Sequence, residues 1–397
     1  MNSPVKNALS FCLAATLLIS GHSTYAAGSD NMQSTSSNFA LKLFTEEAKG
    51  KTENLLVSPF SAYFALSMTM NGAAGKTLAQ MAEVLGTTPE QIDQLNQQNA
   101  ECMKSLAAND GVKLEVANAI YSDKFTPFKQ SFIELCESKY SAEAHSEDFS
   151  KPETVTAINK WCSDKTHGKI TEILKRLTKD EKMVLLNAIY FKGSWQKKFA
   201  NNATQDDHFT GLSGEQSPIK MMHQRLHANY FEGPDFSSIS LDYSGGKQRM
   251  YIFLPKTNIE MNAFEAQFTT ENWKKWMHSY RSTDIALSLP RFKIEYKTDL
   301  KDVLKSMGME AAFTASADFS KMISQRAWIS RVLQKTYMDV NEEGTEAAAV
   351  TAVAVMTRAA MVRPEQPIDF RVDRPFVVAL VDEPTNQILF LGTIAKP

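Results

Sequence analysis

Apolar residues at helical spacing dominate the first third of the chain. Three segments carry this period and stop at turn residues, as helices do. They are Phe39–Lys49, closed by Gly50; Ser58–Met70; and Lys76–Leu85, closed by Gly86. Thr88, with Gln91 three residues later, has the spacing of a capping box and predicts the start of a fourth helix.

Strand patterns follow in two segments that share a tetrapeptide. Leu114–Tyr121 and Met183–Phe191 both contain Asn-Ala-Ile-Tyr, at 118–121 and at 187–190. The second segment is apolar at nearly every position. A strand that is apolar on both faces is typical of the middle of a covered sheet, so we predict that Met183–Phe191 lies there.

The C-terminal half is richer in strand patterns. Between residues 38 and 340 no linker rich in proline or glycine divides the chain, which favours one α+β domain over two. A helix is predicted over Asp299–Met307, closed by Gly308. Alternating or continuous apolar runs predict strands at Tyr251–Leu254, Ile285–Leu289, Phe292–Tyr296, Trp328–Val340, Phe376–Val381 and Ile388–Ile394.

The N-terminal residues 1–26 have the pattern of a secretory signal peptide. The apolar run Ala8–Ile19 is shorter than the roughly 20 residues that span a bilayer, and the small residues after it suit cleavage behind Ala26. Residues 27–37 are small and polar, and predict a disordered lead-in before a folded domain over 38–397. We therefore expect a secreted or periplasmic protein.

Composition narrows the classes of partner. Lys and Arg number 43 against 45 Asp and Glu, and this formal charge of -2 gives no electrostatic case for binding nucleic acid or an anionic membrane. The exported chain keeps Cys102, Cys136 and Cys162, an odd number without the short spacings of a metal site. One disulfide at most is possible, and we expect small, partly buried side chains instead.

No segment of the sequence matches a known motif for catalysis or metal binding in full. Gly72–Thr77 ends like a phosphate-binding loop, but its two glycines are too close, so it predicts a turn between helices. Gly211–Gly214 lacks the final glycine of a nucleophile elbow, because Glu215 stands there. His223 and His227 have no acidic residue between them. The sequence predicts no enzyme, no metal and no organic cofactor.

One stretch, Glu342–Val355, fits neither a core helix nor an ordinary polar loop. It consists largely of small and β-branched residues and follows a strongly strand-like segment. Extended, it would place a row of small side chains on one face, able to enter a packed sheet without displacing its neighbours. These are Thr345, Ala347, Ala349, Thr351 and Val353.

At this stretch the chain resembles the serpin family, and the resemblance covers about Asn38 to Pro397. Each matching motif is weak alone, but together they stand in the family's order. They are Asn54–Ser61, Ala157–Trp161 with Thr166–Ile170, Leu186–Trp195, Leu289–Phe292, Asp318–Ser320, Val340–Ala349 and Asp373–Phe376.

The resemblance implies three β-sheets, eight or nine helices and an exposed reactive-centre loop over about 344–362. In this family a target serine protease cleaves the loop and forms an acyl-enzyme. It is then carried to the far pole as the loop inserts into the main sheet. The protease is distorted there and cannot complete hydrolysis.

The family's usual loop length predicts the scissile bond. Counting fourteen residues on from Gly344 reaches Arg358, so Arg358–Ala359 is the expected bond and a trypsin-like protease the expected target. The segment from Arg358 to Pro375 is longer than in most members. This length raises the bonds after Met361 and Arg363 as rivals. The bond after Met356 is a further rival, which would suit a chymotrypsin- or elastase-like enzyme instead.

The resemblance also assigns two groups of residues around loop insertion. The loop hinge consists of Glu342, Gly344, Thr345, Glu346, Ala347, Ala348 and Ala349, whose small side chains from Ala347 to Ala349 suit an inhibitory member. A sheet-opening cluster is expected from Ser58, Ser61, Asn187, Gln334 and Trp195. Many relatives have histidine where Gln334 stands, so gating by pH through that position is not expected here.

Partners follow from the same resemblance. We expect a covalent complex with a target protease and a monomeric active state. The segment matching the heparin-binding helix of some relatives, Thr88–Ala107, carries Lys104 as its single basic residue against three acidic ones, so heparin binding is not expected. Two alternatives stay open: cross-class inhibition of papain-like cysteine proteases, and a non-inhibitory binding or chaperone-like serpin.

Overall fold

The computed structural model describes residues 22–107, 112–345 and 366–397 of the 397-residue chain, with side chains from Thr35 onward. These residues form nine α-helices and fifteen β-strands. The helices are α1 His22–Ala48, α2 Pro59–Met70, α3 Gly75–Val84, α4 Ile92–Ala107, α5 Gln130–Tyr140, α6 Pro152–Lys165, α7 Met261–Glu265, α8 Thr270–Met277 and α9 Lys301–Ser306.

The strands form two sheets, named here by their size. The six-stranded sheet has the order β10 (Phe292–Asp299), β11 (Ile329–Asn341), β12 (Gly344–Thr345), β4 (Met183–Ser194), β2 (Val112–Asp123) and β3 (Glu143–Glu147). The nine-stranded sheet has the order β1 (Leu55–Val57), β15 (Gln387–Ile394), β14 (Phe376–Asp382), β8 (Gln248–Pro255), β7 (Phe236–Asp242), β6 (Gln216–Glu232), β9 (Arg281–Pro290) and β13 (Ile368–Arg371), with β5 (Gln205–Thr210) paired to β6.

The α+β fold class and the helix number are confirmed, but the sheet number differs from the three expected. Strand β6 has 17 residues and pairs with β5, β9 and β7 in succession along its length. Because one long strand belongs to both halves, hydrogen bonding joins two of the expected sheets into one.

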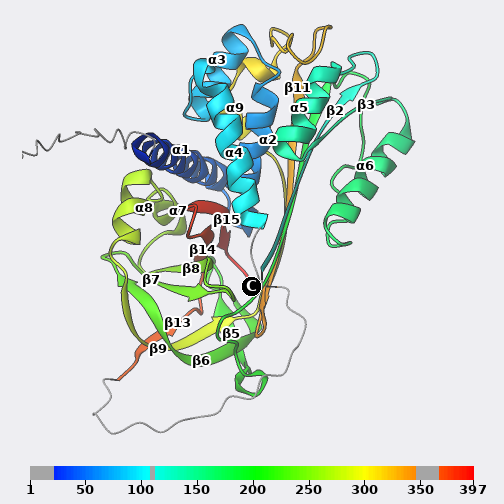
Figure 1. The fold of residues 1–397 in the computed structure, drawn as a ribbon. Coiled ribbons are helices and arrows are strands. Elements are labelled where there is room, and N and C mark those ends of the chain that lie inside the picture. Colours follow the sequence, from blue (N-terminus) through cyan, green and yellow to red (C-terminus); the bar gives the residue numbers. More distant parts are fainter. Residues whose placement is uncertain (1–21, 108–111, 346–365) are drawn as a thin grey trace, which may run out of the picture.

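Strand β4 lies in the middle of the six-stranded sheet, as its apolar run predicts. Leu185 and Ile189 belong to the main core, whereas Leu186 and Ala188 belong to a second cluster that includes Ile158 of α6. Figure 1 shows α6 on one side of this sheet and α2 and α4 on the other. Both faces of β4 are therefore covered.

Helix α2 is the central helix of the fold, because every one of its residues is buried. It begins as predicted, with Ser58 accepting a hydrogen bond from the backbone of Ser61 and proline in the first turn. The predicted capping box at Thr88 is wrong. Thr88 makes no capping bond, and a 3-10 turn, Pro89–Gln91, precedes α4 instead.

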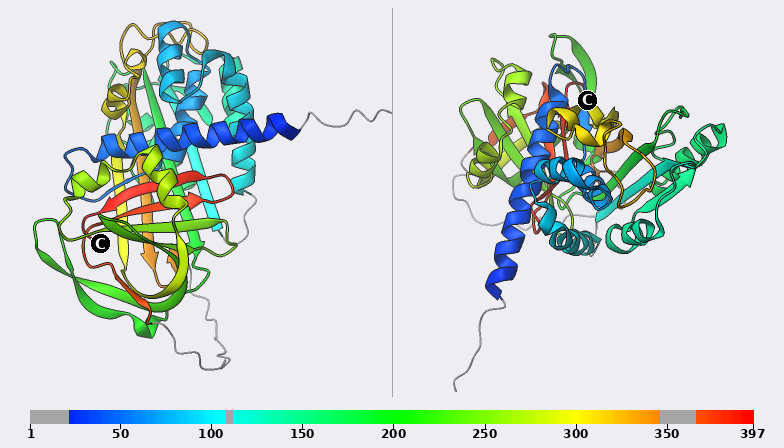
Figure 2. Two further views of the ribbon diagram at one scale, coloured as in Figure 1. Left: turned by 90° about the vertical axis from the view of Figure 1, so that its left-hand side faces the viewer. Right: turned by 90° about the horizontal axis from the view of Figure 1, so that it is seen from above.

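The structure has a helix over 27–37, where the sequence analysis expects a disordered lead-in. Helix α1 begins at His22 and projects from the body at its N-terminal end (Figure 2). Phe39 and Phe44 anchor its other half in the core, and no proline interrupts the residues upstream, so the helix continues outward. Among the described residues no helix is both long and apolar enough to cross a membrane.

The three cysteines of the described chain are free thiols. Cys102, Cys136 and Cys162 are all buried, more completely than the sequence suggests. Burial raises the pKa of each thiol to about 12, because a thiolate is poorly solvated in the core. The thiols therefore act as small apolar groups, and no disulfide links the described strands and helices.

A buried acid in α7 predicts a pH dependence of stability. Glu265 is 4% exposed, and burial raises its pKa from 4.5 to about 7, although the Thr393 hydroxyl, which donates a hydrogen bond to it, acts in the opposite direction. Since the folded state holds this proton more tightly than the unfolded chain, stability falls as pH rises from 4.5 through 7.

We expect Glu265→Gln to stabilise the protein at pH 8 by up to about 3 kcal/mol, because the amide cannot ionise in the core. At pH 5 the gain should be small. Thermal unfolding at both pH values measures this, with Glu271→Gln, an exposed change in α8, as the control. An equal gain in stability at both pH values would contradict a raised pKa for Glu265.

Candidate strand-insertion site

A row of uncharged polar side chains crosses the middle of the six-stranded sheet. Asn187 of β4 lies opposite Asn118 of β2 and, on its other side, opposite Gln334 of β11. The Nδ2 atom of Asn187 donates to Asn118 Oδ1 at 2.5 Å, and Gln334 Nε2 donates to Asn187 Oδ1 at 2.7 Å. Three strands are thus linked by side chains as well as by backbone.

The same row is tied to the N-terminus of α2. Gln334 Nε2 donates to the Ser58 carbonyl at 2.9 Å, and Gln334 Oε1 accepts from the Ser58 backbone N–H at 2.8 Å. Asn187 Nδ2 also donates to the Ser61 hydroxyl. Since all four side chains are at most 1% exposed, each bond lost would leave an unsatisfied polar group in the core.

Asn118 belongs to this group, although the sequence analysis did not assign it. The signal was the repeated tetrapeptide, because Asn118 and Asn187 are its first residues and face each other across an antiparallel pair. Pairing the two copies of the tetrapeptide would have found this residue.

The hinge begins at the far end of the same strands. Strand β12 pairs with β11 on one side, where Thr345 lies opposite Val340, and with β4 on the other, where Thr345 lies opposite Gly193. Further along, β11 and β4 pair directly with each other, from Ile329 to Tyr337. The two hinge residues therefore already lie between two strands that are neighbours over the rest of their length.

Aromatic side chains hold Thr345 in this position. Thr345 is 1% exposed, and its hydroxyl lies 2.5 Å from the Tyr243 hydroxyl. Trp195 stacks on Tyr243 with 4.5 Å between ring centroids and donates from its Nε1 to the Asn341 carbonyl at 2.9 Å. Trp195 thus packs beside the hinge and is not part of the polar row, because seven residues, 188–194, separate it from Asn187.

Gly344 is required by a close backbone approach. Its φ of +148° lies in a region that L side chains rarely adopt, and an added Cβ would lie 2.0 Å from the Gly193 carbonyl oxygen. Any other residue would push β12 away from β4.

Glu342 anchors the chain before the hinge. It is 3% exposed, and Arg291 Nε donates to its Oε1 at 2.8 Å while the Thr204 hydroxyl donates to the same oxygen. Burial alone would raise the pKa of Glu342, but these hydrogen bonds and the Arg291 charge hold it below its usual value. The carboxylate therefore stays charged and fixes where the hinge begins.

The predicted residues fall into three sets. Ser58, Ser61, Asn187 and Gln334 come together in the polar row, whereas Glu342, Gly344, Thr345 and Trp195 come together at the hinge. The remaining ones, Glu346, Ala347, Ala348, Ala349, Arg358 and Ala359, with the rivals Met356, Met361 and Arg363, lie outside the described residues.

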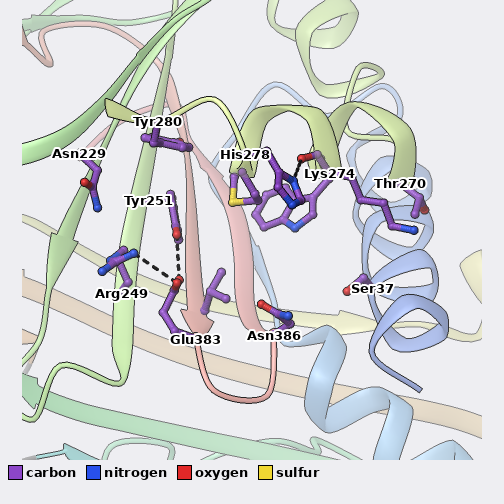
Figure 3. Close-up of a pocket in the computed structure, with 13 residues that line it drawn as sticks. Ser37, Asn229, Arg249, Tyr251, Thr270, Lys274, His278, Tyr280, Glu383 and Asn386 are labelled. Carbon is purple, nitrogen blue, oxygen red and sulfur yellow. Dashed lines mark hydrogen bonds and ion pairs between the residues drawn. The ribbon is translucent and has the colours of Figure 1, made fainter. Parts of the chain in front are cut away.

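A separate pocket lies between α1, α8 and the nine-stranded sheet. It has a volume of about 610 Å³, with Lys274 on one wall and Tyr251 on the other (Figure 3), and Trp273 is among its lining residues. Glu383 accepts hydrogen bonds from Tyr251 at 2.8 Å and from Arg249 at 3.2 Å. No group of three or more metal-ligating side chains occurs here or elsewhere in the described chain.

With the fold and the hinge described, comparison with known proteins identifies the family. The family model described as "Serpin (serine protease inhibitor)" matches residues 34–397. The chain belongs to the serpin family. Family members such as the one below are named as protease inhibitors, not as enzymes.

Three relatives illustrate the range of the family. The leukocyte elastase inhibitor of Xenopus laevis is 36% identical over 385 residues, which cover 93% of this chain and all of that one. The native thermophilic serpin Tengpin superposes with a TM-score of 0.84 at 31% identity, over 92% and 94% of the two chains. Human thyroxine-binding globulin with its thyroxine ligand gives 0.85 at 26% identity, over 93% and 99%.

Replacing Gln334 by Met tests the polar row. The change keeps the length of the side chain but removes three hydrogen bonds and leaves Ser58 N and Asn187 Oδ1 without partners. We expect a loss of about 2–4 kcal/mol, measured as a lower midpoint of thermal unfolding. Gln94→Met, at an exposed position of α4, is the control. Equal midpoints for the two variants would contradict the role given to Gln334.

Proposed function

We propose that the protein is a suicide inhibitor of serine proteases that traps its target by inserting the cleaved loop into the six-stranded sheet. The observation that carries this proposal is the position of β12, whose two residues lie between β11 and β4. They mark the place and the register in which the rest of the loop would follow.

Continuing that register gives a consistent inserted strand. Thr345 pairs with Gly193 of β4 and with Val340 of β11, and six residues further on Thr351 would lie opposite both Asn187 and Gln334. These two residues already face each other, so both ladders agree. The hydroxyl of Thr351 would thus enter the polar row, and the small residues on the same face as Thr345 would face the main core.

The chemistry of trapping follows from the loop length. The serine Oγ of the protease bonds to the carbonyl carbon of Arg358 and its proton passes to the Ala359 nitrogen, so the Arg358–Ala359 amide breaks and Ala359 leaves as a new amino terminus. Fourteen residues at about 3.3 Å each then carry the acylated protease about 45 Å along the sheet. The ester survives because the distorted protease no longer activates water.

We propose Arg358 as the reactive residue and a trypsin-like protease as the target. The relative named as an elastase inhibitor keeps the bond after Met356 as the rival, and cysteine proteases of the papain type remain alternative targets. Arg363 is followed by proline, which disfavours cleavage there. We also propose export of the protein, to the periplasm or outside the cell, on the pattern of residues 1–26.

Incubation with trypsin at an equimolar ratio tests the mechanism. We expect a complex that survives denaturing electrophoresis and a released C-terminal peptide that begins at Ala359, identified by mass spectrometry. Papain and elastase run in parallel test the alternative targets. Cleavage without a complex and without a gain in thermal stability would contradict the proposal and favour a non-inhibitory binding protein.

Replacement of Thr345 by Arg tests the hinge. The guanidinium would have to enter the buried site beside Tyr243, and burying an unpaired charge costs several kcal/mol. We expect the variant to be cleaved as a substrate, with the yield of covalent complex reduced at least tenfold. Thr345→Ser, which keeps the hydroxyl, is the matched control. Undiminished inhibition by the Arg variant would refute loop insertion.

A further inference from the structure

One large aromatic side chain stands out in solvent at the end of β2. Phe125 is 73% exposed, and Leu212, at 42%, is the other large apolar side chain found exposed in the described chain. Leu212 lies in the turn between β5 and β6, in the other sheet. A side chain as large and apolar as Phe125 is usually covered in a folded protein.

The turn that carries Phe125 is held firmly. Asp123, itself 5% exposed, accepts from the Phe125 backbone N–H at 3.0 Å and from the Phe149 N–H at 3.2 Å, through its two carboxylate oxygens. The Lys124 ammonium pairs with Asp148 at 2.7 Å and lies 4.9 Å from the centre of the Phe125 ring. The backbone therefore presents the ring outward at little entropic cost.

This turn lies at the pole opposite the hinge. Strand β2 runs antiparallel to β4, so its last residues neighbour the first residues of β4, and Asp123 N donates to the Lys182 carbonyl at 3.1 Å. The hinge contacts the last residues of β4, Gly193 and Ser194. In Figure 1 the end of β2 that leads to α5 is at the top, and β5 and β6 are at the bottom.

The register of β12 determines how far from the end of the sheet, and from β2, an acylated protease would lie. Continued to the start of β4, it places Val355 opposite Met183, so the acylated Arg358 lies three residues, or about 10 Å, beyond the sheet. The new strand would lie two strand spacings from β2, again about 10 Å. A protease domain of roughly 200 residues has a radius of gyration of about 16 Å, so the turn lies within its reach.

We propose that Phe125 is a docking contact for the trapped protease. The inference rests on the proposed function, because the loop register and the acyl bond bring the protease to this pole. An exposed, pre-positioned aromatic ring supplies apolar contact area at low entropic cost, as interface aromatics do. The contact holds the protease against the pole and slows the escape that hydrolysis of the ester would allow.

The test compares the lifetimes of complexes formed with trypsin. Wild type, Phe125→Ala and the control Leu212→Ala are each reacted to completion, and the reappearance of trypsin activity is followed over days. We expect all three to form the complex at the same rate and to show the same thermal gain on loop cleavage. The Phe125→Ala complex should release active trypsin at least threefold faster than the other two.

A second measurement does not depend on lifetimes. Among the described residues of Phe125→Cys the new thiol is the accessible one, since Cys102, Cys136 and Cys162 are buried, and with Cys12 also replaced by Ser an environment-sensitive dye can be placed there. Its emission should change when trypsin is trapped. It should stay constant when the loop is cleaved by a protease that does not remain attached.

The outcomes separate the two proposals. Equal release rates together with unchanged dye emission would overturn the docking role while leaving the inhibitory function intact. Absence of any denaturation-resistant complex from the wild type would remove both. Self-association that depends on Phe125 and occurs without protease would also overturn the docking role, because the ring would then cover a second copy of the chain.

Discussion

The direct pairing of β11 with β4 is the interaction on which the rest of the molecule depends. These strands are parallel neighbours from Ile329 to Tyr337, yet at one end Gly344 and Thr345 separate them. A strand inserted antiparallel to both would replace one parallel ladder by two antiparallel ladders, which bind somewhat better per residue. The native sheet is therefore fully packed, but its backbone hydrogen bonding is less stable than that of a sheet with the extra antiparallel strand.

The surroundings of this pairing balance two demands. The polar row of Asn118, Asn187 and Gln334 links β2, β4 and β11 to the buried N-terminus of α2, which keeps the sheet closed. At the end of the same strands, Glu342 and Thr345 are anchored by Arg291 and Tyr243, which fixes the register of β12. Side-chain bonds thus hold the seam at two places, in its middle at the polar row and at its end beside β12.

Much of this could be predicted from the sequence, because the relevant signals are local. The doubly apolar run placed β4 in the centre of a sheet, and Ser58 with Pro59 marked the start of α2. The features that the sequence did not predict depend on contacts between distant segments. Asn118 and Asn187 are 69 residues apart, and only the strand register brings them together. Gly344 was assigned to the hinge from the resemblance, but its need for glycine comes from a carbonyl group of another strand. The helical start of α1 depends on core contacts further along the chain.

The free, buried thiols have a mechanical consequence. No covalent cross-link joins β11 to β4, or the helices that cover them, among the described residues. Under the proposed mechanism, the bonds between β11 and β4 that must break for the seam to open are therefore non-covalent. No disulfide among the described residues would act as a fixed pivot if the sheet widened by one strand.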